Sequence, residues 1–264
     1  MDTKWIFMEA DWVGSSPALA PDLNLILAGL EFGLLKKRGG IVALDLDTGK
    51  KRWEYITAEY VHSSPSYFAP GGLVAVGGND KTCYLFRARD GELLWSYKTE
   101  GEIKASFAFD EKRNALFFGS LDGHLYGMDL KRGKPIFKYP TLDGIYSTPL
   151  LCRNRIIFSS LDKRVYGLNL DTRELDWTFD ARSRVFSSPA LIEGNVFIGA
   201  NNGCMYEIHP DTGELLNFFQ ATERITNKIA YNQFSKRFFV PTFANEIYCI
   251  KRKAVTSESN QITV

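Results

Sequence analysis

Cysteine is scarce in this sequence of 264 residues, and the four that occur lie far apart: Cys83, Cys152, Cys204 and Cys249. No two of them stand in a Cys-x-x-Cys pair or at the spacing of zinc ligands, which argues against a disulfide framework and against a structural zinc site. Because all four lie in or near apolar runs, we expect free thiols that pack in the core.

Long apolar runs and an excess of one charge are also missing. No run approaches the ~20 apolar residues that cross a bilayer, and residues 1–12 contain acids and no long apolar stretch, unlike a secretory signal. The 32 basic and 31 acidic side chains leave a formal charge of +1, so no strong field attracts nucleic acid or an anionic membrane. We expect a cytoplasmic monomer that binds neither.

What the sequence does have is an internal repeat. Residues 43–53 read A-L-D-L-D-T-G-K-K-R-W, and an apolar residue follows eight positions after the closing tryptophan, at Val61. The unit returns at residues 85–95, 127–137, 167–177 and 207–217, and the same offset leads from each unit to Ile103, Ile145, Val185 and Ile225. A repeat of 40 to 48 residues is typical of propellers and solenoids.

The pattern within each repeat predicts strands. Apolar or alternating segments of four to seven residues, rich in Val, Ile, Phe and Tyr, are separated by glycine-containing turns such as Asp122-Gly123 and Asp211-Thr212-Gly213. Four short antiparallel strands fit into each repeat, and no segment has a helical period. The bulky aromatic that closes each unit is expected to fill the wedge between neighbouring sheets, and its loss at Asn217 is expected to weaken one such contact.

The apolar residue that follows the unit after eight positions occurs six times, which indicates six blades. The sixth copy begins at the N-terminus, because Trp5 and Val13 keep the same offset while only four residues precede Trp5. Its other half is found at residues 237–241 and 246–251. We therefore predict an all-β, six-bladed β-propeller of four-stranded antiparallel blades, closed by an N-terminal strand that completes the last blade near Tyr248. Residues 1–254 would form one domain and residues 255–264 a flexible tail.

The repeat A-L-D-L-D-T-G-K-K-R-W resembles the tryptophan-docking repeat of quinoprotein dehydrogenases and of the wider PQQ-like β-propeller superfamily. The resemblance extends from Trp5 to Lys251 and implies the fold. The quinone enzymes of this superfamily have eight blades, an adjacent Cys-Cys pair and a carboxylate-rich calcium site. This sequence has six blades and no Cys-Cys, so we expect no quinone, no metal and no other cofactor. Other relatives are non-catalytic scaffolds, and one propeller supports many functions.

The links between blades are the expected binding surface, because in a propeller they surround the mouth of the central channel. The positions beside the constant apolar residue differ between blades and carry charges and aromatic rings. Two blades place lysines where others have Ser, Tyr or Phe, and with nearby arginines these predict a cationic pocket for a carboxylate or phosphate. The candidate site residues are Trp12, Tyr60, His62, Glu102, Lys104, Tyr146, Arg184, Phe186, Arg224, Asn227 and Lys228.

Three neighbouring features have structural interpretations. Ser-Ser-Pro follows one residue after Val13, Val61 and Val185, and these serines are expected to hydrogen-bond to backbone. His124 and His209 lie in strands or turns and are expected to be structural. The longer loop at residues 30–41 is either a lid or partner contact, or a hairpin extension without a role.

Two functional hypotheses remain open. The first is a non-catalytic binding scaffold that docks a protein or an anionic small molecule on the channel-mouth face; no catalytic motif and no phosphate-binding glycine loop occurs in the sequence. The second is a small-molecule lyase, hydrolase or isomerase in the central channel, with His62 as general base among Lys104, Tyr146, Arg184 and Arg224.

Overall fold

The protein is built from antiparallel β-sheets, as its sequence predicts. The computed structural model describes residues 2–33 and 38–252. The chain divides into two compact units, Met1–Thr148 and Pro149–Val264, called unit 1 and unit 2 below. Six sheets occur in the described residues, five of four strands and one of three, and in each the hydrogen-bonded neighbours are consecutive in the chain. These sheets are the blades of a six-bladed β-propeller.

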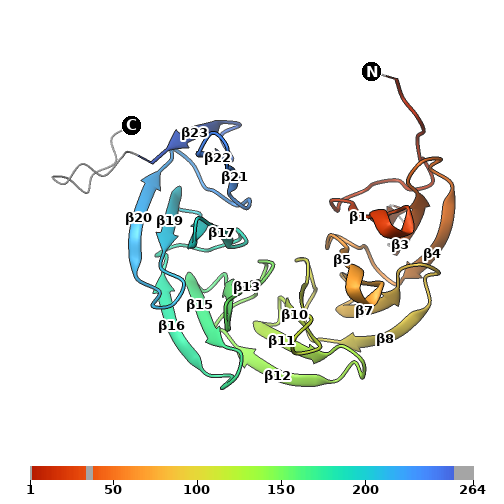
Figure 1. Cartoon of the computed structure of the whole chain (residues 1–264), viewed down its shortest axis with the longest axis horizontal. Helices are drawn as coiled ribbons and strands as arrows, with labels where there is room; N and C mark the ends of the chain where they lie inside the picture. Colours follow the sequence, from red (N-terminus) through yellow and green to blue (C-terminus); the bar gives the residue numbers. More distant parts are fainter. Residues whose placement is uncertain (1, 34–37, 253–264) are drawn as a thin grey trace. The chain divides into compact units, whose positions relative to one another are not determined.

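Unit 1 contains blades 1 to 3 (Figure 1). Short 3-10 turns at Pro21–Leu23 and Ala69–Gly71 connect the first two strands of blades 1 and 2. Blade 1 consists of β1 (Ala18–Ala20), β2 (Leu25–Phe32), β3 (Arg38–Asp45) and β4 (Lys51–Thr57). Blade 2 consists of β5 (Ser66–Phe68), β6 (Leu73–Gly77), β7 (Thr82–Arg87) and β8 (Leu93–Lys98). Blade 3 consists of β9 (Ala108–Asp110), β10 (Ala115–Gly119), β11 (His124–Asp129) and β12 (Pro135–Pro140).

Unit 2 contains blades 4 to 6, which begin with the same short first strand. Blade 4 consists of β13 (Leu150–Cys152), β14 (Arg155–Ser159), β15 (Arg164–Asn169) and β16 (Leu175–Asp180). Blade 5 consists of β17 (Ala190–Ile192), β18 (Asn195–Gly199), β19 (Cys204–Ile208) and β20 (Leu215–Gln220). Blade 6 has three strands, β21 (Ala230–Asn232), β22 (Arg237–Pro241) and β23 (Ile247–Lys251).

The repeat unit marks the same place in every complete blade. It begins at the register shift between the third and fourth strands, for example at Ala43/Leu44 in blade 1 and at Gly167/Leu168 in blade 4. Its Asp-Thr-Gly turn then connects these two strands. At Gly91, in the equivalent turn of blade 2, φ is +75°, a conformation that glycine adopts without strain.

The closing tryptophan of one blade docks onto the turn of the next blade. The Trp53 ring lies against Gly91, and its Nε1–H donates to the carbonyl of Ala88 at 2.8 Å. Trp95 contacts Gly133 and the carbonyl of Leu130 in the same way, and in unit 2 Trp177 contacts Gly213 and donates to Pro210. The predicted role of the aromatic as the filler between sheets is confirmed.

Trp5 docks as the other tryptophans do, although it lies in no strand of the described structure. Its Nε1–H donates to the carbonyl of Leu46 at 3.0 Å, and its ring lies against Gly49 in the turn of blade 1. Trp5 therefore occupies the position of the closing aromatic relative to blade 1, but Val13 is 54 % exposed, whereas the residues at the same offset in the other repeats are buried. Residues 2–17 contain no strand, so the predicted completion of blade 6 by this segment, and with it the single domain of residues 1–254, stays a prediction.

The constant apolar residues lie where links cross from blade to blade. Val61, Ile103 and Ile145 of unit 1 are fully buried, each against a glycine of a second strand. A Cβ on Gly77 would approach Ile103 Cγ2 to 2.3 Å, so only glycine fits there. The serines that follow bond to backbone as predicted: the Gly77 amide donates to Ser63 Oγ at 2.7 Å.

The cysteines and the longer loop of blade 1 can also be compared with their predictions. Cys83, Cys152 and Cys204 are buried free thiols, but Cys249 is exposed, because β23 is the last strand of the three-stranded blade and presents one face outward. The longer loop of blade 1 consists, in its described residues, of extensions of β2 and β3, which are eight residues each. Residues 34–37 of this loop and the predicted tail at 255–264 lie outside the described residues. No helix in the described part of the chain is long and apolar enough to span a membrane.

Candidate functional site

Four of the predicted site residues meet on the blade links of unit 1. Tyr60 and His62 come from the link into blade 2, and Glu102 and Lys104 come from the link into blade 3. The links bring them together because each link is held by the adjacent second hairpin: the Asn79 amide donates to the carbonyl of Tyr60 at 2.8 Å, and the Leu121 amide donates to Glu102 at 2.9 Å.

Lys104 is at the centre of this group. Its ammonium nitrogen lies 2.6 Å from Glu102 Oε2, 2.8 Å from Asn79 Oδ1 and 3.0 Å from His62 Nδ1. An ammonium group has three protons, and these three acceptors use all of them. The Lys104 side chain is only 12 % exposed, whereas that of Glu102 is 41 % exposed. Lys104 is therefore a largely buried and fully hydrogen-bonded cation.

His62 connects Lys104 to a second carboxylate. Because Lys104 donates to Nδ1, that nitrogen holds the lone pair and the proton is assigned to Nε2. Nε2 lies 3.4 Å from Glu31 Oε1, on a side chain that is 11 % exposed. The ring also stacks on Tyr60, with centroids 5.9 Å apart. Both ring nitrogens of His62 are thus occupied, in a chain that runs from Glu31 through His62 and Lys104 to Glu102.

Sequence reasoning missed Glu31 and Asn79, which complete this group. Each stands two residues after the glycine that ends the core of a second strand, Gly29 in blade 1 and Gly77 in blade 2. Glu31 is also the one charged residue in the otherwise apolar strand β2. Aligning the second hairpins of the blades, and not only the links, would have found both. The residues Glu31, Tyr60, His62, Asn79, Glu102 and Lys104 are called the link cluster below.

Trp12 and Tyr146 lie on links of unit 1 but do not belong to the link cluster. Trp12 forms an antiparallel bridge with Glu31, whose amide donates to the carbonyl of Trp12 at 3.0 Å, and its side chain is exposed. Tyr146 is exposed on the link that follows blade 3. Both present aromatic surface to solvent.

The predicted site residues of unit 2 occupy two links. Arg184 and Phe186 precede blade 5, and Arg224, Asn227 and Lys228 precede blade 6. The guanidinium of Arg224 lies 3.8 Å from the centre of the Phe243 ring. Ser187 donates to the carbonyl of Asn227 at 2.9 Å, which ties the two links together. Arg184 and Lys228 are exposed.

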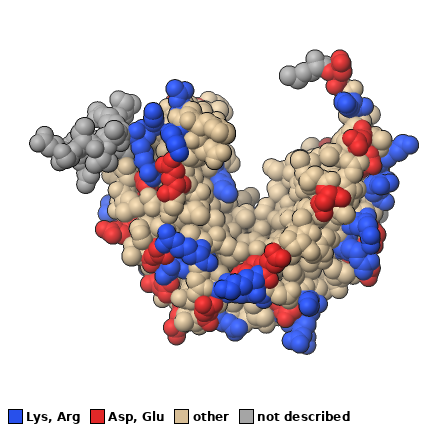
Figure 2. Space-filling model, in the orientation of Figure 1, with Lys and Arg blue, Asp and Glu red and all other residues tan. Residues whose placement is uncertain are grey.

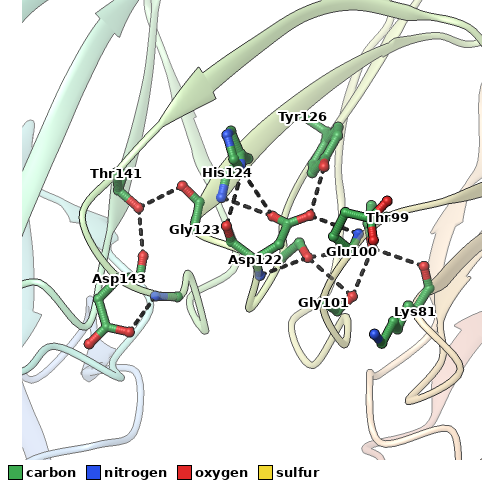
Figure 3. Close-up of polar contacts among 12 residues, drawn as sticks. Lys81, Thr99, Glu100, Gly101, Asp122, Gly123, His124, Tyr126, Thr141 and Asp143 are labelled. Carbon is green, nitrogen blue, oxygen red and sulfur yellow. Dashed lines mark hydrogen bonds and ion pairs between the residues drawn. The ribbon is translucent and has the colours of Figure 1, made fainter.

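A separate polar group in unit 1 stabilises the second hairpin of blade 3 (Figure 3). Asp122 accepts from Tyr126 Oη at 2.7 Å, from the Glu100 amide at 3.0 Å and from the His124 amide at 3.1 Å. Burial raises the pKa of Tyr126, and the bond to Asp122 raises it further. Burial alone would raise the pKa of Asp122, but the hydrogen bonds from Tyr126, Glu100 and His124 outweigh it and lower the pKa.

The same arrangement recurs in other blades, which identifies it as structural. Tyr84 donates to Asp80 at 2.7 Å in blade 2, Tyr166 donates to Asp162 in blade 4, and Asn202 bonds to Tyr206 in blade 5. Burial raises the pKa of Tyr206 to about 12. His124 Nδ1 lies 3.2 Å from Asp122 Oδ1 within this hairpin, so the structural role expected for His124 is confirmed.

The chain matches a known protein family. A family model described as the β-propeller of β-alanine-activating enzyme matches residues 36–263. The chain belongs to this family. No curated protein matches it by sequence.

Solved structures similar to this family member share its fold. The computationally designed Ika8 protein has a TM-score of 0.76 at 16 % identity, over 90 % of this chain and 70 % of the designed one. BamB from Moraxella catarrhalis has a TM-score of 0.63 at 16 % identity, over 96 % of this chain and 87 % of BamB. The predicted membership of the PQQ-like β-propeller superfamily is confirmed. At this identity the two structures show the fold and not the site.

Proposed function

We propose that the chain is a non-catalytic binding module that docks a protein partner on the link cluster. The observation that carries this proposal is the saturation of His62 and Lys104. A general base needs a lone pair within reach of the substrate proton, and in this arrangement the Nδ1 lone pair of His62 faces the Lys104 ammonium while Nε2 faces Glu31. A catalytic lysine needs a free amine, and Lys104 donates to three acceptors.

The family's description names an enzyme, and this is compatible with a binding role for the propeller. Activation of an amino acid needs a base, a nucleophile or a site for a phosphate-bearing cosubstrate. The link cluster offers no free group of the first two kinds, and the sequence has no phosphate-binding glycine loop. We therefore assign the chain the role of the accessory propeller of a β-alanine-activating enzyme, with the activation chemistry outside this chain.

The charge of the link cluster favours one kind of partner. The cluster contains two carboxylates, Glu31 beside His62 and Glu102 beside Lys104, and one ammonium, so apart from the imidazole it has one negative charge in excess. Tyr60 and Trp12 add aromatic surface. A protein segment with a basic side chain next to an aromatic one fits this surface, because it can pair with the half-exposed Glu102 and stack on the rings. An anion would have to displace Glu102 from Lys104.

Figure 2 shows why the local cluster, and not a long-range field, must select the partner. Acidic and basic side chains are interspersed on the visible face of each unit, in agreement with the net charge of +1. Steering over long distances needs a surface of one sign. The specificity of binding is therefore expected to come from short-range contacts, and the association rate constant is expected to be modest.

A peptide titration tests the proposal. Fluorescence anisotropy would measure binding of a short labelled peptide with Arg-Trp-Arg between Gly-Ser flanks, with Asp-Trp-Asp in the same flanks as the charge-reversed probe. We expect the basic peptide alone to bind, and Glu102→Gln to weaken it about tenfold, as for the loss of one close charge pair. Glu100→Gln, an exposed carboxylate two residues away, is the matched control. Equal binding of both peptides, or equal loss in both variants, contradicts the proposal.

The enzyme hypothesis has its own test. Incubation of the purified chain with β-alanine and ATP, and with panels of ester, amide and hydroxy-acid substrates, should give no turnover. Turnover that disappears in His62→Gln while the variant keeps its thermal unfolding midpoint would establish a catalytic site and overturn the scaffold role.

A further inference from the structure

Unit 1 has a pocket between blades 2 and 3 that contains no residue of the link cluster. Its volume is about 510 Å³, within the usual range of roughly 300–1,000 Å³ for small-molecule sites. It is formed by the 3-10 turn after β5, by β8, and by the β9–β10 and β11–β12 turns. The lining residues are Phe68, Pro70, Gly71, Leu73, Leu94, Glu111, Asn114, Leu130 and Lys131.

Asn114 occupies a repeated position whose side chain is capped in other blades. In blade 1 the equivalent Asn24 donates from Nδ2 to Asp47 Oδ2 at 3.0 Å. In blade 4 the equivalent Asn154 donates to Asp171 Oδ2 at 2.8 Å. The carboxylate in both cases belongs to the turn between the third and fourth strands. Blades 1 and 4 therefore contain a small carboxylate site that is filled from within the chain.

Blade 3 has the same backbone there but lacks the carboxylate. The Leu130 amide donates to the carbonyl of Asn114 at 3.0 Å, as the Leu46 amide does to Asn24 at 2.9 Å. However, Lys131 stands at the position of Asp47 and Asp171. Within the described residues no hydrogen bond or ion pair is formed by the side chain of Asn114 or of Lys131. The amide of Asn114 and the ammonium group of Lys131 thus line the pocket without the hydrogen bond between asparagine and aspartate that blades 1 and 4 have.

The rest of the lining sets the size and charge of a ligand. Phe68, Leu73, Leu94 and Leu130 give the pocket an apolar wall, and Phe68 is held by stacking on Phe109 with ring centroids 4.9 Å apart. Glu111 is the only acidic residue of the lining, and it disfavours a second negative charge on the ligand. A carboxylate bound by Asn114 and Lys131, with an apolar body on the wall, satisfies these groups.

We propose that this pocket binds a monocarboxylic acid with an apolar body, whose carboxylate replaces the internal cap of blades 1 and 4. The site is separate from the link cluster, so the proposal stands or falls without the proposed docking function. It also gives the anionic small molecule expected from the sequence a place that differs from the predicted one.

Calorimetric titration with octanoate tests this proposal, with octylamine as the charge-reversed probe and octyl phosphate as the dianion. We expect octanoate to bind more tightly than either. Lys131→Asp rebuilds the cap seen at Asn24 and Asp47, so it should reduce octanoate affinity about tenfold or more and raise the unfolding midpoint. Asn114→Gly, the residue that blade 2 has at this position, should weaken binding by a smaller factor.

Two controls keep the test decisive. Lys131→Met removes the charge without offering a carboxylate, and it should weaken octanoate binding without the gain in stability. Lys112→Asp makes the same charge change at an exposed position outside the lining, and it should leave binding unchanged. Octylamine binding as tightly as octanoate, or undiminished octanoate binding in both Lys131 variants, would overturn the proposal.

Discussion

Trp53 and Ala88, 35 residues apart, are joined by a buried hydrogen bond of 2.8 Å that connects blade 1 to blade 2. The indole ring of Trp53 covers the turn at Gly91, so one side chain supplies both the apolar filling and the polar contact between the two sheets. The same contact recurs at Trp95, between blades 2 and 3, and at Trp177, between blades 4 and 5, and Trp5 makes it with the turn of blade 1.

Trp53→Phe is expected to destabilise the protein by about 1–3 kcal/mol, because the carbonyl of Ala88 would stay buried without its donor. Urea unfolding followed by circular dichroism measures the change. Trp12→Phe is the control, since Trp12 is exposed and makes no such bond in the described structure. An equal loss in the two variants would show that ring size, and not the Nε1–H bond, matters.

The fold could be predicted because the residues that make the contact between blades recur in most of the repeats. The aromatic, the turn glycine and the apolar residue eight positions later all act between neighbouring blades, so their offsets stay constant. The link cluster could be predicted only in part. Lys104 stands out as a departure from the Ser-Ser-Pro links, and His62 as a titratable neighbour of one, but Glu31 and Asn79 reach them from the second hairpins, which the pattern of the links does not include.

Asn217 illustrates a second limit of the sequence pattern. The loss of the aromatic there predicted a weaker contact between blades 5 and 6. That weakening stays a prediction, and the structure has a buried carboxylate, Glu207, opposite Asn217 on β19. Glu207 forms an ion pair with Arg252 and accepts from Asn195 Nδ2 at 2.6 Å. This arrangement depends on Arg252, which directly follows β23 and which no local repeat reveals.

Arg252→Ala is therefore expected to be more destabilising than its position near the chain end suggests. It would leave Glu207 buried without its cation, a change that costs about 3–5 kcal/mol for a fully buried pair and less here, because the Arg252 side chain is 37 % exposed. Thermal unfolding would measure it against Lys251→Ala, the exposed neighbour on β23. In a Glu207→Gln background the effect of Arg252→Ala should shrink; an unchanged effect would contradict the ion-pair explanation.

Acid stability should depend on Asp122. The pKa of Asp122 is lowered in the folded protein, so its contribution to stability is present above the unfolded value near 3.8 and is lost as the pH falls through the lower folded value. Asp122→Asn should therefore be less stable than the wild type at pH 7, and the difference should shrink below about pH 4. Urea unfolding at several pH values would show this convergence. Asp2→Asn, at an exposed position, should show no such trend, and a constant difference for Asp122→Asn would exclude the proposed linkage.

The predicted completion of blade 6 by the N-terminal segment can be tested by cross-linking. In blade 4 the tryptophan Trp177 pairs with Gly167 on the third strand. Carried over to blade 6 by aligning Tyr166 with Tyr248, this register places Trp5 opposite Cys249 and Phe7 opposite Ile247.

Phe7→Cys with Ile247→Cys, in a Cys249→Ser background, should then form an intrachain disulfide under mild oxidation, detected by a mobility shift without reductant. Phe7→Cys with Lys251→Cys is the control for register. It displaces the second thiol by four residues, roughly 13 Å along a strand, which is beyond the reach of a disulfide. Because a mobile N-terminal segment would sample both positions, similar cross-linking of the two pairs would argue against a defined fourth strand. Cross-linking of the first pair alone would establish both the pairing and its register.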